Sequence, residues 1–263
     1  TAATVFSIVP GHVVGANGKT PPSEKLNIAG IGIGGMGRGN IGACKGENVV
    51  ALCDVDSAYA GKTFKAHPNA ATYVDYRLML EKQNDIDAVV IATPDHTHAV
   101  ITMAAIEMGK HVYCQKPLTH TVEEARKITA AARASKVQTQ MGNQGHSSDA
   151  IRVVREWVQS GSIGDVKEVH AWTDRPDDGP WYANFGARDL PSDFPAVPDS
   201  LNWDLWLGPT QDRKFSPAYH PFKWRAWLDF GTGALGDMGC HILDPACWAL
   251  DLMNPSSITA EVK

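Results

Sequence analysis

The sequence predicts an α/β fold, in which a doubly wound parallel sheet is followed by a second α/β domain with a largely antiparallel open sheet. Short apolar strands alternate with helical segments through the first 145 residues. These strands are continuous apolar runs, which are typical of parallel sheets covered on both faces. A glycine-rich turn follows the first strand directly, and 263 residues with 43% hydrophobic content allow two domains with their own cores.

The first strand, Leu26 to Ile31, leads into the motif Gly32-x-Gly34-x-x-Gly37, and a helix is expected to begin near Arg38. In dinucleotide-binding folds the first glycine permits a tight turn, the second lets the backbone approach a pyrophosphate, and the third lets the helix pack on the strand. The pyrophosphate then lies on the N–H groups of the helix N-terminus. An alternative register, Gly30-x-Gly32-x-x-Gly35, would place a turn glycine inside the strand, so we prefer the later one. The expected cofactor residues of this turn are Gly32, Gly34, Gly35, Met36 and Gly37.

The second strand, Asn48 to Cys53, ends in Asp54, about 20 residues beyond the glycines. At this spacing a carboxylate accepts hydrogen bonds from the adenosine ribose hydroxyls. Its negative charge would repel a 2′-phosphate, so NAD is favoured over NADP. The alternative interpretation of Asp54 is a solvated strand end, and Asp56 is the second choice for the ribose contact.

The elements that follow continue the alternation up to residue 141. Helices are expected over 58–66, 76–83, 97–108 and 121–135, and strands over 71–74, 87–93, 111–114 and 137–141. Thr121-x-x-Glu124 is a capping box at the start of the last of these helices. Ligands of parallel sheets bind beyond the carboxyl ends of the strands. Four loops follow strands directly and are therefore expected to meet in one crevice: 32–37, 93–98, 115–118 and 142–146.

The pattern changes after residue 148. We expect a leader over 1–23, a dinucleotide-binding domain over 24–145 and a substrate and oligomerisation domain over 146–263. In the last of these, a helix is expected over 151–161, an alternating strand over 166–173 and a helix over 235–250. The start of another strand over 257–262 is interrupted by the end of the chain, so we expect part of this domain to be absent from the sequence.

The long segment 174–227 has little periodicity and is rich in proline, aspartate, glycine and tryptophan. Tryptophan side chains there can act as core anchors or as a platform for a sugar ring. We interpret most of them as anchors, because large aromatic side chains stabilise a fold whatever its function. The tryptophans concerned are Trp181, Trp203, Trp206, Trp224 and Trp227.

Composition and charge restrict the class of protein. The net charge of −5 and the pI near 6.0 argue against a nucleic-acid partner, because phosphate contacts need a clustered basic surface. No apolar run reaches membrane-spanning length. The five cysteines lack CxxC spacing and are expected to be free thiols, most of them buried. Residues 1–10 (TAATVFSIVP) are similar to the end of a signal peptide, so we expect export to the periplasm, or a cytoplasmic protein if they are only a tail.

Four motifs occur in order along the chain: Gly32-x-Gly34-x-x-Gly37, Ala92-Thr93-Pro94-Asp95-x-x-His98, Gln115-Lys116-Pro117 and Asp237-x-x-x-His241. Together they resemble the Gfo/Idh/MocA family of sugar and polyol oxidoreductases, and within it the exported, saccharide-associated branch that includes NAD-dependent glycoside hydrolases. The resemblance extends from Lys25 to the end of the chain. It implies an N-terminal Rossmann domain that binds NAD, and a second domain whose open sheet carries substrate contacts and forms a homo-oligomer.

The resemblance also implies catalytic roles. Lys116 would hydrogen-bond the substrate hydroxyl near the nicotinamide, His241 would move the hydroxyl proton, and Asp237 would be the partner of His241. Residues four apart on a helix face the same way, so Asp237 and His241 can reach one site. Histidine titrates near neutral pH and suits a general base. Gln115 departs from the family, which usually has glutamate there, and its neutral amide brings no negative charge to the nicotinamide side.

Further contacts are implied by the same motifs. The remaining expected cofactor residues are Thr93, Pro94, His98, Gln115, Lys116 and Asn143. The remaining expected substrate residues, beside Lys116, Asp237 and His241, are His146, His170 and Arg175. His96 and His98 are an alternative pair of metal ligands, but no third ligand is near in sequence, so no metal site is expected.

These expectations combine into one leading function and two alternatives. The leading hypothesis is an NAD-dependent oxidoreductase that acts on a hydroxyl of a sugar or glycoside by hydride transfer to nicotinamide. The second is an NAD-dependent glycoside hydrolase, in which a transient oxidation permits elimination of the leaving group. The third is a non-enzymatic protein that binds a nucleotide and a sugar.

Overall fold

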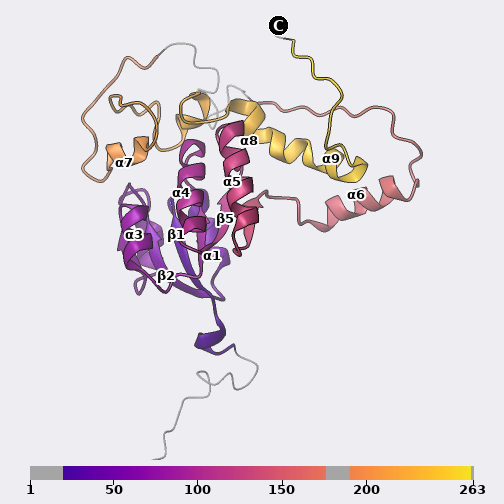
Figure 1. Ribbon diagram of the computed structural model, residues 1–263. Coiled ribbons are helices and arrows are strands. Elements are labelled where there is room, and N and C mark those ends of the chain that lie inside the picture. Colours follow the sequence, from indigo (N-terminus) through magenta and orange to yellow (C-terminus); the bar gives the residue numbers. More distant parts are fainter. Residues whose placement is uncertain (1–19, 176–189, 262–263) are drawn as a thin grey trace, which may run out of the picture.

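A computed structural model describes residues 20–175 and 190–261 (Figure 1). Within these ranges one sheet of six parallel strands has the order β3-β2-β1-β4-β5-β6, as predicted for a doubly wound fold. The strands are β1 (Asn27–Ile31), β2 (Asn48–Cys53), β3 (Ala71–Tyr73), β4 (Ala88–Ile91), β5 (His111–Gln115) and β6 (Thr139–Gly142). The strand order reverses between β1 and β4, which is where ligands of such sheets bind.

Helices connect the strands of this sheet. They are α1 (Met36–Ala43), α2 (Gly61–Ala66), α3 (Tyr76–Lys82), α4 (Asp95–Glu107) and α5 (Val122–Ala134), and a short 3₁₀ helix, η2 (Pro22–Glu24), precedes β1. The predicted capping box of α5 is present: Thr121 Oγ1 accepts from the N–H of Glu124, and Glu124 Oε2 accepts from the N–H of Thr121 at 2.8 Å. None of the helices in the described ranges combines the length and apolar character that a bilayer crossing requires.

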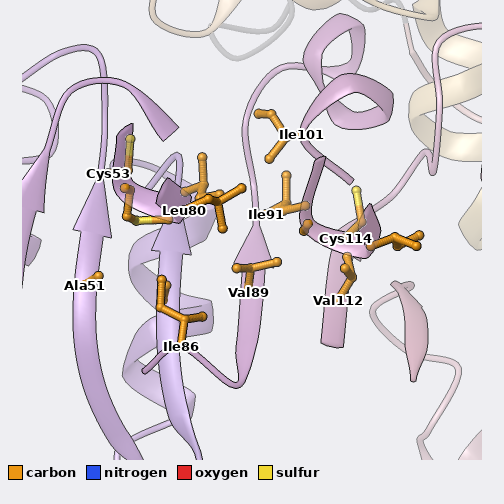
Figure 2. Close-up of a cluster of buried hydrophobic side chains, with 14 of the residues drawn as sticks. Ala51, Cys53, Leu80, Ile86, Val89, Ile91, Ile101, Val112 and Cys114 are labelled. Atoms are coloured by element: carbon orange, nitrogen blue, oxygen red, sulfur yellow. The ribbon is translucent and has the colours of Figure 1, made fainter. Parts of the chain in front are cut away.

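Apolar side chains cover both faces of the sheet. Because successive residues of a strand point to opposite faces, Ala29 and Ile31 of β1 join one core cluster and Ile28 joins the other. The larger cluster packs under α3, α4 and α5, and Figure 2 shows its side chains extending from the strands. Burial on both faces of the sheet therefore explains why the strands are continuously apolar, as the sequence predicts.

The regular elements of the second part of the chain are helices in the described ranges, separated by long irregular segments. Its helices are α6 (Asp149–Gln159), α7 (Trp203–Leu207), α8 (Gly233–Ile242) and α9 (Asp244–Leu250), with a 3₁₀ turn, η3 (Lys223–Ala226). Figure 1 shows α6 lying beside α9, and the two helices are in contact. The single helix predicted over 235–250 is divided into α8 and α9, because Pro245 lies in the first turn of α9 and its ring would clash with a continuing helix.

Two strand predictions are wrong. Residues 166–173 and 257–261 have no regular secondary structure, and nearly all of their side chains are exposed. A strand needs a neighbouring strand to satisfy its N–H and C=O groups, and the described residues of this part supply none. The alternating polarity of residues 166–173 is typical of a strand. Alternation alone, however, does not supply the neighbouring strand that a sheet requires.

An aromatic cluster holds the segment from Leu201 to Phe230 together. Its buried members are Leu201, Trp206, Leu207, Phe215, Tyr219, Trp224 and Phe230, with Trp203 and Trp227 packed against them. Trp203 stacks on Trp206 with their rings 4.6 Å apart at 12°. These four tryptophans are therefore core anchors, as predicted, and Trp181 lies outside the described residues.

Candidate active site

A pocket of about 800 Å³ opens at the carboxyl ends of the strands. The four loops that were expected to converge all contribute to it. Its walls include Gly32, Thr93, Lys116 and Gln144 from these loops, together with the second-part residues Arg175, His220, Arg225, Asp237 and His241. Residues from both parts of the chain therefore face a single cavity.

The glycine turn is shaped by contacts that exclude side chains. Gly32 has a φ of +74°, and its N–H donates to the carbonyl of Cys53 at 2.9 Å. A Cβ on Gly37 would lie 1.9 Å from the carbonyl oxygen of Gly32. Gly30 lies inside β1, so the turn adopts the later of the two glycine registers. Backbone N–H groups at the start of α1 are consequently free to approach a pyrophosphate.

Asp54 lies at the end of β2 and lines the pocket, where the ribose contact was expected. Its Oδ2 accepts from the N–H of Ile33 at 2.8 Å, and its Oδ1 accepts from the N–H of Asp56 at 3.0 Å. Burial raises the pKa of Asp54 to about 6, although these backbone hydrogen bonds oppose the shift. Each carboxylate oxygen has a further lone pair, so a ribose hydroxyl can still bind there.

Asp56, the second choice for the ribose contact, has a different role. Its carboxylate accepts from the N–H groups of Ala58 and Tyr59, from Ser200 Oγ at 3.0 Å and from His220 Nε2 at 2.8 Å. Asp56 is not among the residues that line the pocket. It joins the second part of the chain to the end of β2, so that alternative is wrong.

Among the residues that the structure describes, three buried polar atoms on pocket residues have no hydrogen-bond partner: Thr93 Oγ1, Gln115 Nε2 and His220 Nδ1. Such atoms are costly to bury unless a partner satisfies them. Thr93 follows β4, Gln115 ends β5, and His220 is bonded to Asp56, three residues after the end of β2. These unpaired atoms and the glycine cradle fit an elongated polar ligand such as a dinucleotide, lying across the strand ends.

Lys116 and Asp237 form the charged centre of the pocket. Lys116 Nζ donates to Asp237 Oδ1 at 2.7 Å and to the Asp237 carbonyl at 2.8 Å. Arg175 donates to Asp237 Oδ2 at 2.6 Å, and the Arg225 Nε lies 3.6 Å from Asp237 Oδ1. Burial alone would raise the pKa of Asp237, but the bond to Lys116 and the three positive charges lower it. Asp237 is therefore ionised and holds the Lys116 ammonium group in the site.

His241 lies one turn after Asp237 on α8 and lines the same pocket. The predicted pairing of these two residues is wrong, since the Asp237 carboxylate is bonded to the cations and His241 Nδ1 lies 3.2 Å from the carbonyl of Gln144. A carbonyl only accepts, so Nδ1 carries the proton and Nε2 keeps a lone pair. Burial and the charge of Lys116 lower the pKa of His241, so the imidazole is neutral at neutral pH and can act as a base.

Gln144 is a pocket residue that sequence reasoning missed. Its Nε2 donates to Gln115 Oε1 at 2.8 Å, while its carbonyl orients His241. The sequence predicts that the loop containing it, 142–146, lies at the site, but indicates only Asn143 and His146 as contacts. Tyr59, His220 and Arg225 were also missed, because Tyr59 lies past the acidic strand end and the other two lie in the aperiodic segment 174–227.

His98 was expected beside the cofactor, but it is buried behind the pocket wall. Its Nδ1 lies 2.7 Å from the Pro117 carbonyl and its Nε2 lies 2.8 Å from the Thr93 carbonyl. Burial disfavours a charged imidazole, yet the Cys114 side chain, the Asp95 carboxylate and the Pro117 carbonyl raise the pKa of His98 to about 9. The imidazolium donates to both carbonyls and thus connects the loop of Thr93 to the loop of Lys116.

Three other expected contacts lie outside the pocket lining. Asn143 Nδ2 donates to the Cys240 carbonyl at 2.8 Å and so fastens β6 to α8. His146 Nδ1 bonds to Asp244, 2.8 Å away, and its ring lies 4.9 Å from that of Trp248 on α9. His170 is exposed, and its Nε2 lies 3.4 Å from Glu168 Oε1. The bond of Asn143 connects the first part of the chain to α8, and the bond of His146 holds the start of the second part on α9. His170 lies in residues 166–173, which form no strand.

The alternative metal site at His96 and His98 is also excluded by the geometry. His96 is 2% exposed, with ring nitrogens 3.0 Å from the Trp206 carbonyl and 3.3 Å from the Phe230 carbonyl. Burial lowers the pKa of His96 to about 4, so it is neutral and structural. Across the described part of the chain, no three histidine, cysteine or acidic side chains gather as a metal site would require. All five cysteines are free thiols, as predicted, but the expectation that most of them are buried is wrong, since only Cys53 and Cys114 are buried.

Comparisons with known proteins agree with this geometry. Residues 26–143 match a family described as "Oxidoreductase family, NAD-binding Rossmann fold" (GFO_IDH_MocA), and residues 149–263 match the C-terminal alpha/beta domain of the same oxidoreductase family. Together the two matched ranges cover nearly the whole chain.

Among curated relatives, levoglucosan dehydrogenase of Pseudarthrobacter phenanthrenivorans is 28% identical over 173 residues, which are 65% of this chain and 35% of the relative. Inositol 2-dehydrogenase of Serratia proteamaculans is 31% identical over 162 residues, which are 60% of this chain and 48% of the relative. The solved myo-inositol 2-dehydrogenase of Lactobacillus plantarum is 27% identical, with a TM-score of 0.51 over 54% of this chain and 43% of that one. The chain thus spans less than half the length of these relatives.

Proposed function

The chain belongs to the Gfo/Idh/MocA oxidoreductase family, and from this we propose that it carries the cofactor and catalytic residues of an NAD-dependent dehydrogenase. The substrate we propose is a ring hydroxyl of a sugar, a cyclic polyol or a glycoside. One observation supports this above all others: Lys116 and His241, from the two parts of the chain, line the same pocket as the glycine turn and Asp54.

The proposed cofactor contacts follow from the residues along the strand ends. The N–H groups at the start of α1 would hold the pyrophosphate, and Asp54 would accept from the adenosine ribose. Thr93 Oγ1 and Gln115 Nε2, which have no partner in the described structure, would bond to the nicotinamide half. NAD, when bound, supplies the acceptor for the hydride of the carbinol carbon.

The protein's own part in the reaction is to bind the hydroxyl and to move its proton. The Lys116 ammonium group would donate to the hydroxyl oxygen and stabilise the negative charge that develops there. Nε2 of His241 would accept the proton, because its Nδ1 proton is held by the Gln144 carbonyl. Asp237 positions Lys116 by accepting hydrogen bonds from its Nζ at both the carboxylate and the backbone carbonyl. The neutral Gln115 adds no negative charge beside Lys116, and its amide bonds to Gln144 instead.

The experiment begins with purified protein and NAD. Inositol and levoglucosan are suitable first substrates, because relatives are named for acting on them. NADH formation at 340 nm with one such polyol or sugar would support the dehydrogenase. Release of free sugar from a glycoside without net NADH would support the NAD-dependent hydrolase instead, and binding of NAD and sugar with neither product would support the non-enzymatic alternative.

We further propose that the protein is exported and forms a homo-oligomer. The apolar segment TAATVFSIVP supports export, and cell fractionation tests it, since recovery only from the cytoplasm would contradict it. An oligomer is supported by α6, none of whose side chains is buried, although Val153, Val154 and Trp157 are apolar. Light scattering during size-exclusion chromatography measures the oligomeric state, and a monomer at all concentrations would contradict it.

A further inference from the structure

Tyr59 lies against the glycine turn, in a place where only glycine leaves room for its ring. A Cβ on Gly34 would be 2.1 Å from Tyr59 Cδ1, and a Cβ on Gly35 would be 2.7 Å from the Tyr59 hydroxyl oxygen. Gly35 is the N-cap of α1 and has no side chain to cap the helix. The Tyr59 hydroxyl therefore lies beside the free N–H groups at the start of α1.

Contacts on three sides hold Tyr59 in this position. The Asp56 carboxylate accepts from its N–H at 3.0 Å, and its ring packs edge-on against His220 with centroids 6.0 Å apart. His220 is itself bonded to Asp56 at 2.8 Å. Because the glycine turn forms the third side, the ring has little freedom to turn away. The Asp56–His220 pair is thus a support for Tyr59 as well as a connection between the two parts of the chain.

The Tyr59 hydroxyl is available to a ligand. Tyr59 lines the pocket and is 40% exposed, and within the described ranges its hydroxyl has no hydrogen-bond partner. Burial of the ring region raises the pKa of Tyr59, so the hydroxyl keeps its proton at neutral pH. A phenol proton beside the N-terminus of a helix is a suitable donor to an anionic oxygen.

We propose that the Tyr59 hydroxyl donates a hydrogen bond to the pyrophosphate of the cofactor, and that Asp56 and His220 position it to do so. The inference rests on the proposed function, because it assumes that a dinucleotide occupies the pocket. It adds a side-chain donor to a site in which the glycine motif supplies only backbone N–H groups. Tyr59 is consequently a cofactor-binding residue that follows the acidic strand end by five positions.

The test compares the binding of four compounds to the wild-type protein and to Tyr59→Phe, which keeps the ring and removes only the hydroxyl. The compounds are NAD, ADP-ribose, ADP and adenosine, and their dissociation constants are measured by calorimetry or by competition. We expect Tyr59→Phe to bind the three pyrophosphate compounds about tenfold more weakly, as loss of a hydrogen bond to a charged group predicts. Adenosine should bind to both proteins within about twofold, since it has no pyrophosphate.

Tyr73→Phe is the matched control. Tyr73 lies in β3, and its hydroxyl bonds to Gln83 outside the pocket, so its loss should leave all four constants unchanged. Equal or tighter binding of ADP and ADP-ribose by Tyr59→Phe would overturn the inference and leave the proposed function standing. Weaker binding of adenosine by the same factor would also overturn it, because the lost contact would then not be one to the pyrophosphate. Failure of the wild-type protein to bind any of the nucleotides would overturn the proposed function itself.

Discussion

The two parts of the chain are built in different ways. Residues 27–142 form a sheet whose two faces are covered by apolar clusters, so this part has a core of its own. The described residues of the second part have one aromatic cluster, and no side chain of α6 is buried. The first part is therefore stabilised mainly by burial of its own apolar surface, and the second depends more on its contacts with the first.

Those contacts are polar and specific. Asp56 bonds to His220, His96 bonds to carbonyls of the aromatic segment, and Asp95 accepts from Thr232. Lys116–Asp237 is the contact that coincides with the catalytic centre. Docking of the second part and assembly of the catalytic residues are therefore the same event, whereas the glycine turn and Asp54 belong to the first part alone.

The largest expected effect is a loss of stability when the glycine turn of the first part is altered. Gly37→Ala places a Cβ 1.9 Å from the Gly32 carbonyl oxygen, so we expect a loss of about 3 kcal/mol or more in the free energy of unfolding, with loss of NAD binding. Gly39→Ala is the control on the same helix, where a Cβ meets nothing within 4 Å. It should leave stability unchanged or raise it by up to about 1 kcal/mol, measured by urea unfolding. Equal stability of the two variants would refute the close packing of this turn.

Substitutions in the catalytic centre should have a different effect: they should abolish most of the activity but leave cofactor binding intact. Lys116→Met and His241→Asn should each lower kcat by about 10²- to 10⁴-fold while the NAD dissociation constant changes by less than about threefold. Lys127→Met, at an exposed pair with Glu123, is the control and should keep full turnover. Full turnover by either catalytic variant would remove that residue from the mechanism.

Loss of one polar contact between the two parts should produce an intermediate effect. Thr232→Val removes the hydroxyl that donates to the buried Asp95 carboxylate at 2.8 Å, and the expected cost is about 1–3 kcal/mol of unfolding free energy. Thr129→Val, whose hydroxyl bonds within α5 on the surface, should cost less than about 0.5 kcal/mol. A thermal unfolding comparison distinguishes them. If the two variants had the same melting temperature, the bond between Thr232 and Asp95 would not contribute to stability.

The smallest expected effect is the pH dependence of cofactor binding. Below pH 6 the raised pKa of Asp54 leaves its carboxyl protonated, and above pH 6 the carboxylate is a stronger acceptor for ribose hydroxyls. NAD affinity should therefore rise by about three- to tenfold as the pH increases from 5 to 7. Asp54→Asn should bind NAD more weakly with no such rise. An identical pH profile in both proteins would show that another group controls it.

The predictions that succeeded rest on local chemistry. Gly32 and Gly37 could be identified because their positions admit no side chain, and the capping box of Thr121 and Glu124 is a property of four consecutive residues. The central strands β1, β2 and β4 could be predicted because each is a nearly continuous apolar run. The predictions that failed, by contrast, concerned partners: Asn143 binds the Cys240 carbonyl of α8, His146 binds Asp244 of α9, and residues 166–173 have no neighbouring strand in the described structure.

By itself, the sequence determined the parallel sheet, the register of the glycine turn and the presence of Asp54, Lys116 and His241 at the ends of elements. Periodicity and turn chemistry act over a few residues, so they can be read without coordinates. Only the tertiary structure decided that Asp237 binds Lys116 rather than His241, that Gln144 orients the base, and that Tyr59 lies on the glycine turn. Such partners are set by the competition of charges and hydrogen-bonding groups brought together from distant parts of the chain, which spacing along the sequence does not encode.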